Sequence, residues 1–141
     1  MIERLTCIML VDDNPLDAFF HKLVIKKYNS ETTIIIKNNG LEALEYLKSM
    51  RSENNMQPDL IFLDINMPYM TGWEFLKEYH QLDIELQSKA IIILTTSDYL
   101  DDYLRAKRLS FLSDFITKPL TNKIMDDVFS KYFSKETTSI A

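Results

Sequence analysis

LIFLDINMP, residues 60–68, is the stretch that decides the fold. Its four leading apolar residues run directly into Asp64, with Pro58-Asp59 before them and Pro68 soon after. A short apolar run between turn residues is typical of a buried strand, and apolar side chains on both faces favour a central strand of a parallel sheet. Ligands collect at the carboxyl ends of strands in such sheets, which makes Asp64 a candidate functional residue. This stretch alone is equally consistent with a solvated aspartate at a strand end.

Length and composition indicate one domain with a substantial core. The chain has 141 residues, of which 46% are hydrophobic and 26% charged, as in ordinary globular proteins. A net charge of -5 disfavours direct nucleic-acid binding, which needs a basic face. Cys7, the single cysteine, lies in an apolar run and is interpreted as a small buried residue. Without a signal peptide or an apolar run of about 18 residues, a cytoplasmic protein without membrane contact is expected.

Apolar patterning predicts strands that alternate strictly with helices. The strands are expected at 5–11, 32–37, 59–64, 90–94 and 114–117, and the helices at 15–28, 39–52, 71–81, 98–109 and 121–133. Asn14-Pro15 marks the start of the first helix, and Ser97 or Asp98 is expected to cap the fourth. The first helix is predicted from apolar residues at helical spacing, namely Leu16, Phe19, Phe20, Leu23, Val24 and Tyr28.

Two ambiguous segments lie between these elements. Asn39-Gly40 resembles a hairpin turn, but apolar residues continue after it at helical spacing, so a helix is preferred. Residues 81–88 form a connector with room for one helical turn. Strict alternation predicts an α/β fold, a doubly wound parallel sheet with helices on both faces. One domain is expected over 1–134, followed by a flexible tail at 135–141.

Polar residues follow four of the predicted strands. Asp12-Asp13 follow the first, Asp64 ends the third, Thr95 follows the fourth and Lys118 follows the fifth. The carboxyl ends of parallel strands share one edge, so these side chains should converge. Three close carboxylates repel one another unless a cation joins them, and Mg2+ prefers such oxygen ligands. We therefore expect Mg2+, with Asp64 attacking a phosphoryl group whose charge Lys118 and Thr95 stabilise. Each of these groups alone is more often structural.

These motifs resemble the receiver domain of two-component response regulators. The matching segments are the acidic pair, LDINMP at 63–68 with Gly72, LTTS at 94–97 and FITKP at 115–119. The resemblance spans roughly residues 5–133 and implies a flavodoxin-like sheet with strand order 2-1-3-4-5. LTTSD and the long connector also resemble the phytochrome-associated single-domain regulators.

The resemblance implies a role for each site residue. Asp64 becomes the phosphoacceptor, and Asp13 joins it as a direct Mg2+ ligand. Asp12 acts mainly through a metal-bound water, and Asn66 offers its backbone carbonyl. Lys118 contacts the phosphoryl group, and its bond to Pro119 is expected to be cis.

Two positions carry the expected switch. Thr95 supplies the switch hydroxyl, and Phe115 occupies the position of the aromatic switch residue. Phe115 lacks the hydroxyl of the tyrosine often found there, so that hydrogen bond is not available. Thr96 departs from the small residue that is usual in the family.

The resulting hypothesis is a stand-alone receiver that takes a phosphoryl group from a sensor histidine kinase. It is expected to be a switch rather than a turnover enzyme. An alternative is a relay intermediate that passes phosphate to a histidine phosphotransfer protein. A haloacid-dehalogenase-type phosphatase is less favoured, because Asn66 stands where a second aspartate is needed. A flavodoxin-like cofactor carrier is also disfavoured, because Asp12-Asp13 would repel a phosphate.

Residues outside this site also carry expectations. His21 and His80 are interpreted as surface or helix-end residues, and Trp73 as a packing residue. The last helix has two apolar stripes, made of Ile124, Met125, Val128, Phe129, Tyr132 and Phe133. One stripe exceeds what the core needs and predicts an interaction face, with homodimerisation as one use. This face comprises the fourth helix, fifth strand and last helix, with Tyr99, Tyr103, Phe115, Met125, Phe129 and Phe133.

Overall fold

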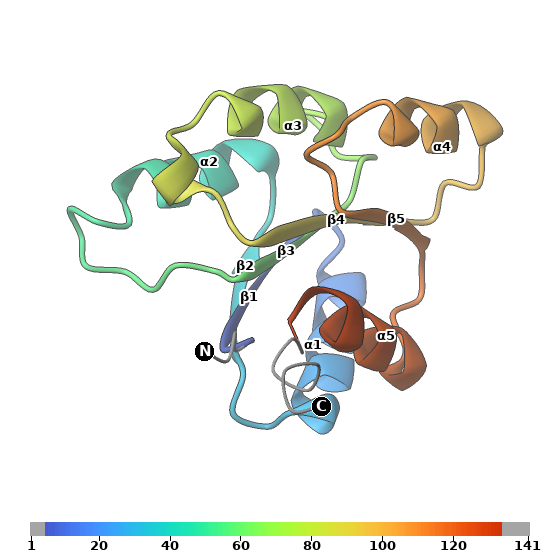
Figure 1. Cartoon of the computed structure of the whole chain (residues 1–141), viewed down its shortest axis with the longest axis horizontal. Helices are drawn as coiled ribbons and strands as arrows, with labels where there is room; N and C mark the ends of the chain where they lie inside the picture. The colour runs from blue at the N-terminus through green and yellow to red at the C-terminus, as the bar shows by residue number, and fades with distance from the viewer. Residues whose placement is uncertain (1–4, 134–141) are drawn as a thin grey trace, which may run out of the picture.

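The computed structural model describes residues 5–133, and the tail expected at 135–141 lies outside them. A central sheet is covered by α2, α3 and α4 on one face and by α1 and α5 on the other (Figure 1). The strands are β1 (Cys7–Val11), β2 (Thr33–Lys37), β3 (Leu60–Leu63), β4 (Ala90–Thr95) and β5 (Asp114–Thr117). The α-helices are α1 (Pro15–Tyr28), α2 (Gly40–Ser49), α3 (Gly72–His80), α4 (Leu100–Lys107) and α5 (Asn122–Tyr132), and a short 3-10 helix covers Ile84–Leu86.

The sheet confirms the predicted topology. Its strand order is β2-β1-β3-β4-β5, and all four pairs of neighbouring strands are parallel. β3 lies in the centre, and all four of its residues are buried. Successive side chains point to opposite faces of the sheet. Ile61 and Leu63 therefore enter the core under α2 and α3, whereas Leu60 and Phe62 enter the core under α1 and α5.

Helix starts follow the expected capping chemistry at three of the helices that frame the site. The Asn14 side chain accepts the N–H groups of Leu16 and Asp17 at α1, and the Asn39 side chain accepts the N–H of Glu42 at α2. A capping box between Thr71 and Glu74 starts α3. The hairpin at Asn39-Gly40 was correctly rejected, because α2 begins there.

The predicted N-cap of α4, Ser97 or Asp98, is wrong. Tyr99 is the N-cap and makes no side-chain cap bond. Ser97 instead donates its hydroxyl to the Asp102 carboxylate at 2.5 Å, which ties the segment before α4 to its first turn.

The apolar faces of α1 and α5 differ from the prediction. Ala18, His21 and Ile25 form the buried side of α1, whereas Phe19 and Phe20, used to predict the helix, are exposed. Met125 of α5 and Phe133, which follows that helix, were predicted to lie on an interaction face but are buried in the core. Phe129 is half-buried and its ring lies 6.4 Å from that of Tyr28 on α1. These positions pack where α5 lies against α1, so the predicted surplus stripe is largely core.

Candidate functional site

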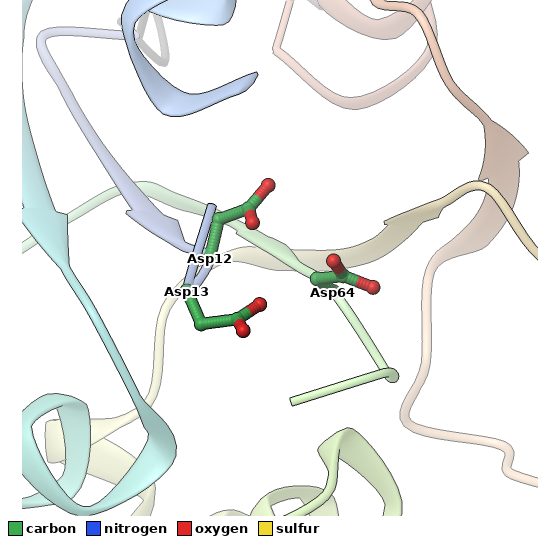
Figure 2. Close-up of side chains that lie close together, drawn as sticks. All are labelled: Asp12, Asp13 and Asp64. Atoms are coloured by element: carbon green, nitrogen blue, oxygen red, sulfur yellow. The ribbon is translucent and has the colours of Figure 1, made fainter. Parts of the chain in front are cut away.

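Three carboxylates meet at the carboxyl edge of the sheet. Asp12 and Asp13 follow β1 directly, and Asp64 follows β3, which pairs with β1 (Figure 2). The Asp64 N–H donates to the Val11 carbonyl at 3.0 Å, so the strand pairing itself places Asp64 beside the acidic pair. One carboxylate oxygen from each aspartate lies within 4.8 Å of the others. Asp12 and Asp64 are buried, whereas Asp13 is exposed.

Backbone N–H groups orient the two buried carboxylates. The Asn14 N–H donates to Asp12 at 2.9 Å, and the Asn66 N–H donates to Asp64 at 3.0 Å. Each bond links an aspartate to the residue two positions later, at the turn leaving its strand. These turns hold both carboxylates toward the space between β1 and β3. The predicted use of the Asn66 carbonyl as a ligand stays a prediction.

Lys118 supplies the positive charge among these groups. Its ammonium lies 2.8 Å from Asp12, 2.8 Å from Asp17 and 3.1 Å from Asp64, and its side chain is 7% exposed. The Lys118 N–H donates to the Thr95 carbonyl at 2.7 Å, which fixes the backbone after β5 against β4. The Lys118–Pro119 bond is cis, as expected.

The ionisation of this cluster reflects burial and ion pairing together. Burial raises the pKa of Asp12, although hydrogen bonds from Lys118 and from the Asn14 N–H oppose that shift. Burial alone would lower the pKa of Lys118, but its hydrogen bonds to Asp12 and Asp17 and the Asp64 charge raise it above its usual value. Lys118 is therefore a permanent cation at neutral pH.

Thr95 lies directly against the candidate phosphoacceptor. It is fully buried, and its hydroxyl donates to an Asp64 oxygen at 3.0 Å. The Ser97 N–H donates to the Thr95 hydroxyl at 3.3 Å, which connects the site to the segment before α4. Phe115 is half-buried on β5. Its ring packs edge to face against the ring of Tyr103 on α4, with the two ring centroids 6.0 Å apart. A cavity of about 170 Å³ lies beside Phe115 between α4 and β5.

The structure adds two residues to the neighbourhood of the site. Asp17 contacts Lys118 directly, and its place in the first turn of α1, four residues after Asp13, was the available sequence signal. His21 is 4% exposed and lines a small cavity behind Asp12 and Asp64, so the surface assignment for His21 is wrong. Burial and the Lys118 charge lower the pKa of His21.

The other two residues weighed from the sequence lie away from the carboxylates. His80 is exposed and stacks on Phe111 with ring centroids 4.1 Å apart. Trp73 packs against the core, with the Arg105 guanidinium 4.5 Å from its ring centroid. Both have the structural roles that were expected.

The donor set fits a divalent cation of the Mg2+ type. Carboxylate oxygens are the hard ligands that such an ion prefers, and three of them converge here from two adjacent strand ends. Lys118 offsets only part of the negative charge, since three aspartates contact its single ammonium. Asp13 is also free of that ion pair and exposed, so it can accept an ion from solvent.

Gly72 keeps the loop after Asp64 tight. A Cβ at Gly72 would lie 2.5 Å from the Ile65 Cα and 2.8 Å from the Asp64 carbonyl oxygen, both backbone atoms. Gly72→Ala should therefore displace the loop and lower the free energy of unfolding by about 2 kcal/mol. Gly40→Ala is the matched control, because its Cβ would meet mainly the flexible end of Met70. Urea denaturation should show little change for Gly40→Ala, and an equal loss in both variants would contradict the argument.

The comparison with known proteins agrees with this geometry. Residues 8–130 match the family model described as response regulator receiver domain. This chain belongs to that family. The receiver domain is a signalling module of two-component systems, and the predicted fold and family are thereby confirmed.

Relatives include regulators named for phytochromes. The receiver domain is 33% identical over 112 residues to response regulator Rcp1 of Synechocystis sp., covering 79% of this chain and 75% of Rcp1. A crystal structure of the Mn(2+)-bound form of Rcp1 superposes with a TM-score of 0.74 at 29% identity, covering 91% of this chain and 94% of Rcp1. The phosphorylated cyanobacterial phytochrome response regulator RcpA gives a TM-score of 0.77 at 27% identity, covering 92% and 94% of the two chains. These similarities agree with the resemblance to phytochrome-associated regulators.

This chain is also similar to parts of longer proteins. The sensor histidine kinase CheAY of Helicobacter pylori is 27% identical over 129 residues, which is 92% of this chain and 15% of CheAY. Membership of the receiver family excludes the two alternatives raised by the sequence, a haloacid-dehalogenase-type phosphatase and a flavodoxin-like cofactor carrier. Within residues 5–133, none of the helices combines the length and hydrophobicity needed to cross a bilayer.

Proposed function

We propose that this receiver domain is a switch controlled by phosphorylation of Asp64, with a histidine kinase as donor. The observation that carries the proposal is that the buried Asp64 carboxylate contacts both the Lys118 ammonium at 3.1 Å and the Thr95 hydroxyl at 3.0 Å. An Asp64 oxygen forms a bond to phosphorus while the bond between phosphorus and the donor breaks. The kinase histidine, or acetate when acetyl phosphate is the donor, is the leaving group. The product is a modified protein, so the domain acts as a switch rather than a turnover enzyme.

The neighbouring groups prepare Asp64 for this reaction. Lys118 can hold a phosphoryl oxygen through its ammonium, and the Thr95 hydroxyl can donate to a second one. Mg2+ is the proposed cofactor, and Asp12, Asp13, Asp64 and the Asn66 carbonyl would hold it. When bound, Mg2+ neutralises the carboxylates and the charge on the transferring oxygens. The solved Mn(2+)-bound form of the similar regulator Rcp1 supports a divalent ion as cofactor of this receiver domain.

Intact mass spectrometry tests the proposal. Incubation with acetyl phosphate and Mg2+ should add one phosphoryl group, and chelation of Mg2+ should slow the gain by at least about 100-fold, since metal ions supply several kcal/mol of charge stabilisation. Asp13→Ala should show a similar defect, because Asp13 is the exposed carboxylate of the set. Asp98→Ala, which removes an exposed carboxylate that is not part of the acidic cluster, is the control. Equal rates with and without chelator would refute the role of the metal.

Thr95→Ala should separate phosphorylation from its consequence. The variant keeps Asp64 and Lys118, so it should still gain a phosphoryl group. It loses the hydroxyl that links the segment before α4 to the site. The phosphorylation-dependent change in partner binding should therefore fall about ten-fold, which is the effect of losing one charge-assisted hydrogen bond. Thr95→Ser, which keeps the hydroxyl, is the control. Thr95→Ala that responds as strongly as wild type would contradict this coupling.

The output face is proposed at α4, β5 and α5, revised to the residues that are exposed or half-buried there. Tyr99, the N-cap of α4, and Tyr103 within α4 are exposed, and the Phe115 ring lies beside that of Tyr103. Ile124 and Tyr132 of α5 line a groove of about 400 Å³ together with Phe115. Phosphorylation acts by favouring one arrangement of this face over another. A second copy of the chain is one proposed occupant, and the cytoplasm is the proposed location.

A further inference from the structure

A groove of about 310 Å³ lies between α3 and the end of α4, two helices that cover the same face of the sheet (Figure 1). Its apolar surface is formed by Trp73, Leu76, Leu109 and Phe111. Leu76 is buried and the other three side chains are half-buried, so this apolar surface is recessed. A recessed apolar surface of this volume is within the range of small-molecule sites, whereas a protein-binding face usually presents exposed apolar side chains in a broad patch.

Two stacked pairs of side chains connect the walls of this groove. The Arg105 guanidinium of α4 lies 4.5 Å from the centroid of the Trp73 ring on α3, which places a cation against the aromatic wall. The His80 ring at the end of α3 stacks on Phe111, with ring centroids 4.1 Å apart and planes inclined by 10°. The walls are therefore built largely from flat rings, and flat rings pack well against an aromatic ligand.

The charge at this groove is positive and lacks a partner. Lys77 and Arg105 line the groove, and no aspartate or glutamate of residues 5–133 does. Neither cation forms an ion pair with a carboxylate in that part of the chain, in contrast to Lys118, which contacts three. Ammonium and guanidinium groups bind carboxylate or phosphate oxygens through charge-assisted hydrogen bonds. The complement of this groove is therefore an apolar ring that carries an anionic group.

We propose that this groove binds a small aromatic anion, with its ring between the aromatic walls and its acidic group at Lys77 and Arg105. Both parts of the ligand are needed. A neutral ring leaves the two cations without a partner, and an inorganic anion leaves the apolar surface in water. Binding does not require phosphorylation, because none of Asp12, Asp13 and Asp64 lines the groove.

Titration of the full chain with naphthalenesulfonate, a flat apolar ring system with one permanent negative charge, tests the proposal. Trp73 is the single tryptophan, so its indole N–H gives one peak in proton–nitrogen correlation NMR spectra, and that peak reports on the groove itself. The peak should shift to saturation with a Kd of about 1 mM or tighter, given the binding energy usual for each ligand atom. The matching naphthalenesulfonamide has nearly the same shape and no charge. It should bind about ten-fold more weakly, the effect of losing two exposed ion pairs.

Charge substitutions test where the acidic group lies. Arg105→Gln and Lys77→Gln should each lower the preference for sulfonate over sulfonamide about three-fold, the effect of one exposed ion pair. Both side chains are exposed and neither is paired with a carboxylate of the described residues, so both variants should fold. Lys107→Gln is the matched control. Lys107 is also an exposed cation of α4, but its ammonium lies 5.4 Å from the Tyr103 ring centroid and it does not line the groove. It should keep the wild-type preference.

Three results would overturn the proposal. A Trp73 peak that neither ligand moves leaves the groove to a protein partner. Equal affinity for the sulfonate and the sulfonamide reduces the groove to an apolar patch without a site for an anion. A loss of preference in Lys107→Gln as large as in Arg105→Gln assigns that preference to the general surface charge. Asp64→Asn should bind naphthalenesulfonate as wild type does, so a failure of this site is distinguishable from a failure of the proposed phosphorylation.

Discussion

Asp64→Asn should abolish the gain of a phosphoryl group from acetyl phosphate or from a kinase. The amide has nearly the shape of the carboxylate, and its oxygen can still accept hydrogen bonds from Thr95 and from the Asn66 N–H. It carries no negative charge and is a far weaker nucleophile, so phosphorylation should fall below detection. Lys118 keeps its contacts with Asp12 and Asp17, so the fold should survive. Intact mass with donor and Mg2+ measures the outcome directly.

Asp17→Asn is the matched control for this substitution. Its carboxylate also contacts Lys118, at 2.8 Å, but it lies on α1 and its side chain is 36% exposed. It makes no contact with Thr95, so it lacks the second donor that faces Asp64. The control should keep the mass gain. A full gain in Asp64→Asn together with its loss in Asp17→Asn would move the phosphoacceptor to Asp17.

The sheet could be predicted because its central strands are apolar on both faces. β1, β3 and β4 are buried along their whole lengths, so each appears in the sequence as a continuous apolar run. Strict alternation with helices then indicates parallel strands, and parallel strands place all their carboxyl ends on one edge. This geometry alone predicts that the side chains after these strands lie close together, namely Asp12, Asp13, Asp64, Thr95 and Lys118.

The rotation of the outer helices could not be predicted in the same way. α1 has apolar residues on both sides, so its pattern does not reveal which side meets the sheet. Packing against α5 selects the side with Ala18 and Ile25, and this rotation buries His21 and turns Phe19 outward. Asp17 reaches Lys118 for the same reason. The prediction of a surplus exposed stripe on α5 is wrong for the same kind of reason, because α1 covers part of that stripe.

Lys118→Met should produce the largest loss of stability among single changes in the site. The ammonium is 7% exposed and contacts three carboxylates, and methionine keeps an apolar stem of similar length without the charge. Asp12 and Asp64 then remain buried beside Asp13 with no cation between them. Removing one partner from a buried ion pair costs about 3 kcal/mol or more, and urea denaturation in the presence of a chelator should show a loss of this size.

Mg2+ should restore much of that loss, and this dependence separates an electrostatic role from simple packing. The ion takes the place of the missing charge, and at 100 times its dissociation constant it contributes about 2.7 kcal/mol through binding to the folded state. Wild type should gain less, because the Lys118 ammonium already engages Asp12 and Asp64. Lys123→Met is the control, since Lys123 forms an exposed pair with Asp127 and its loss should change stability by less than about 0.5 kcal/mol. If Lys118→Met is destabilised equally with and without Mg2+, the three carboxylates do not form a shared cation site.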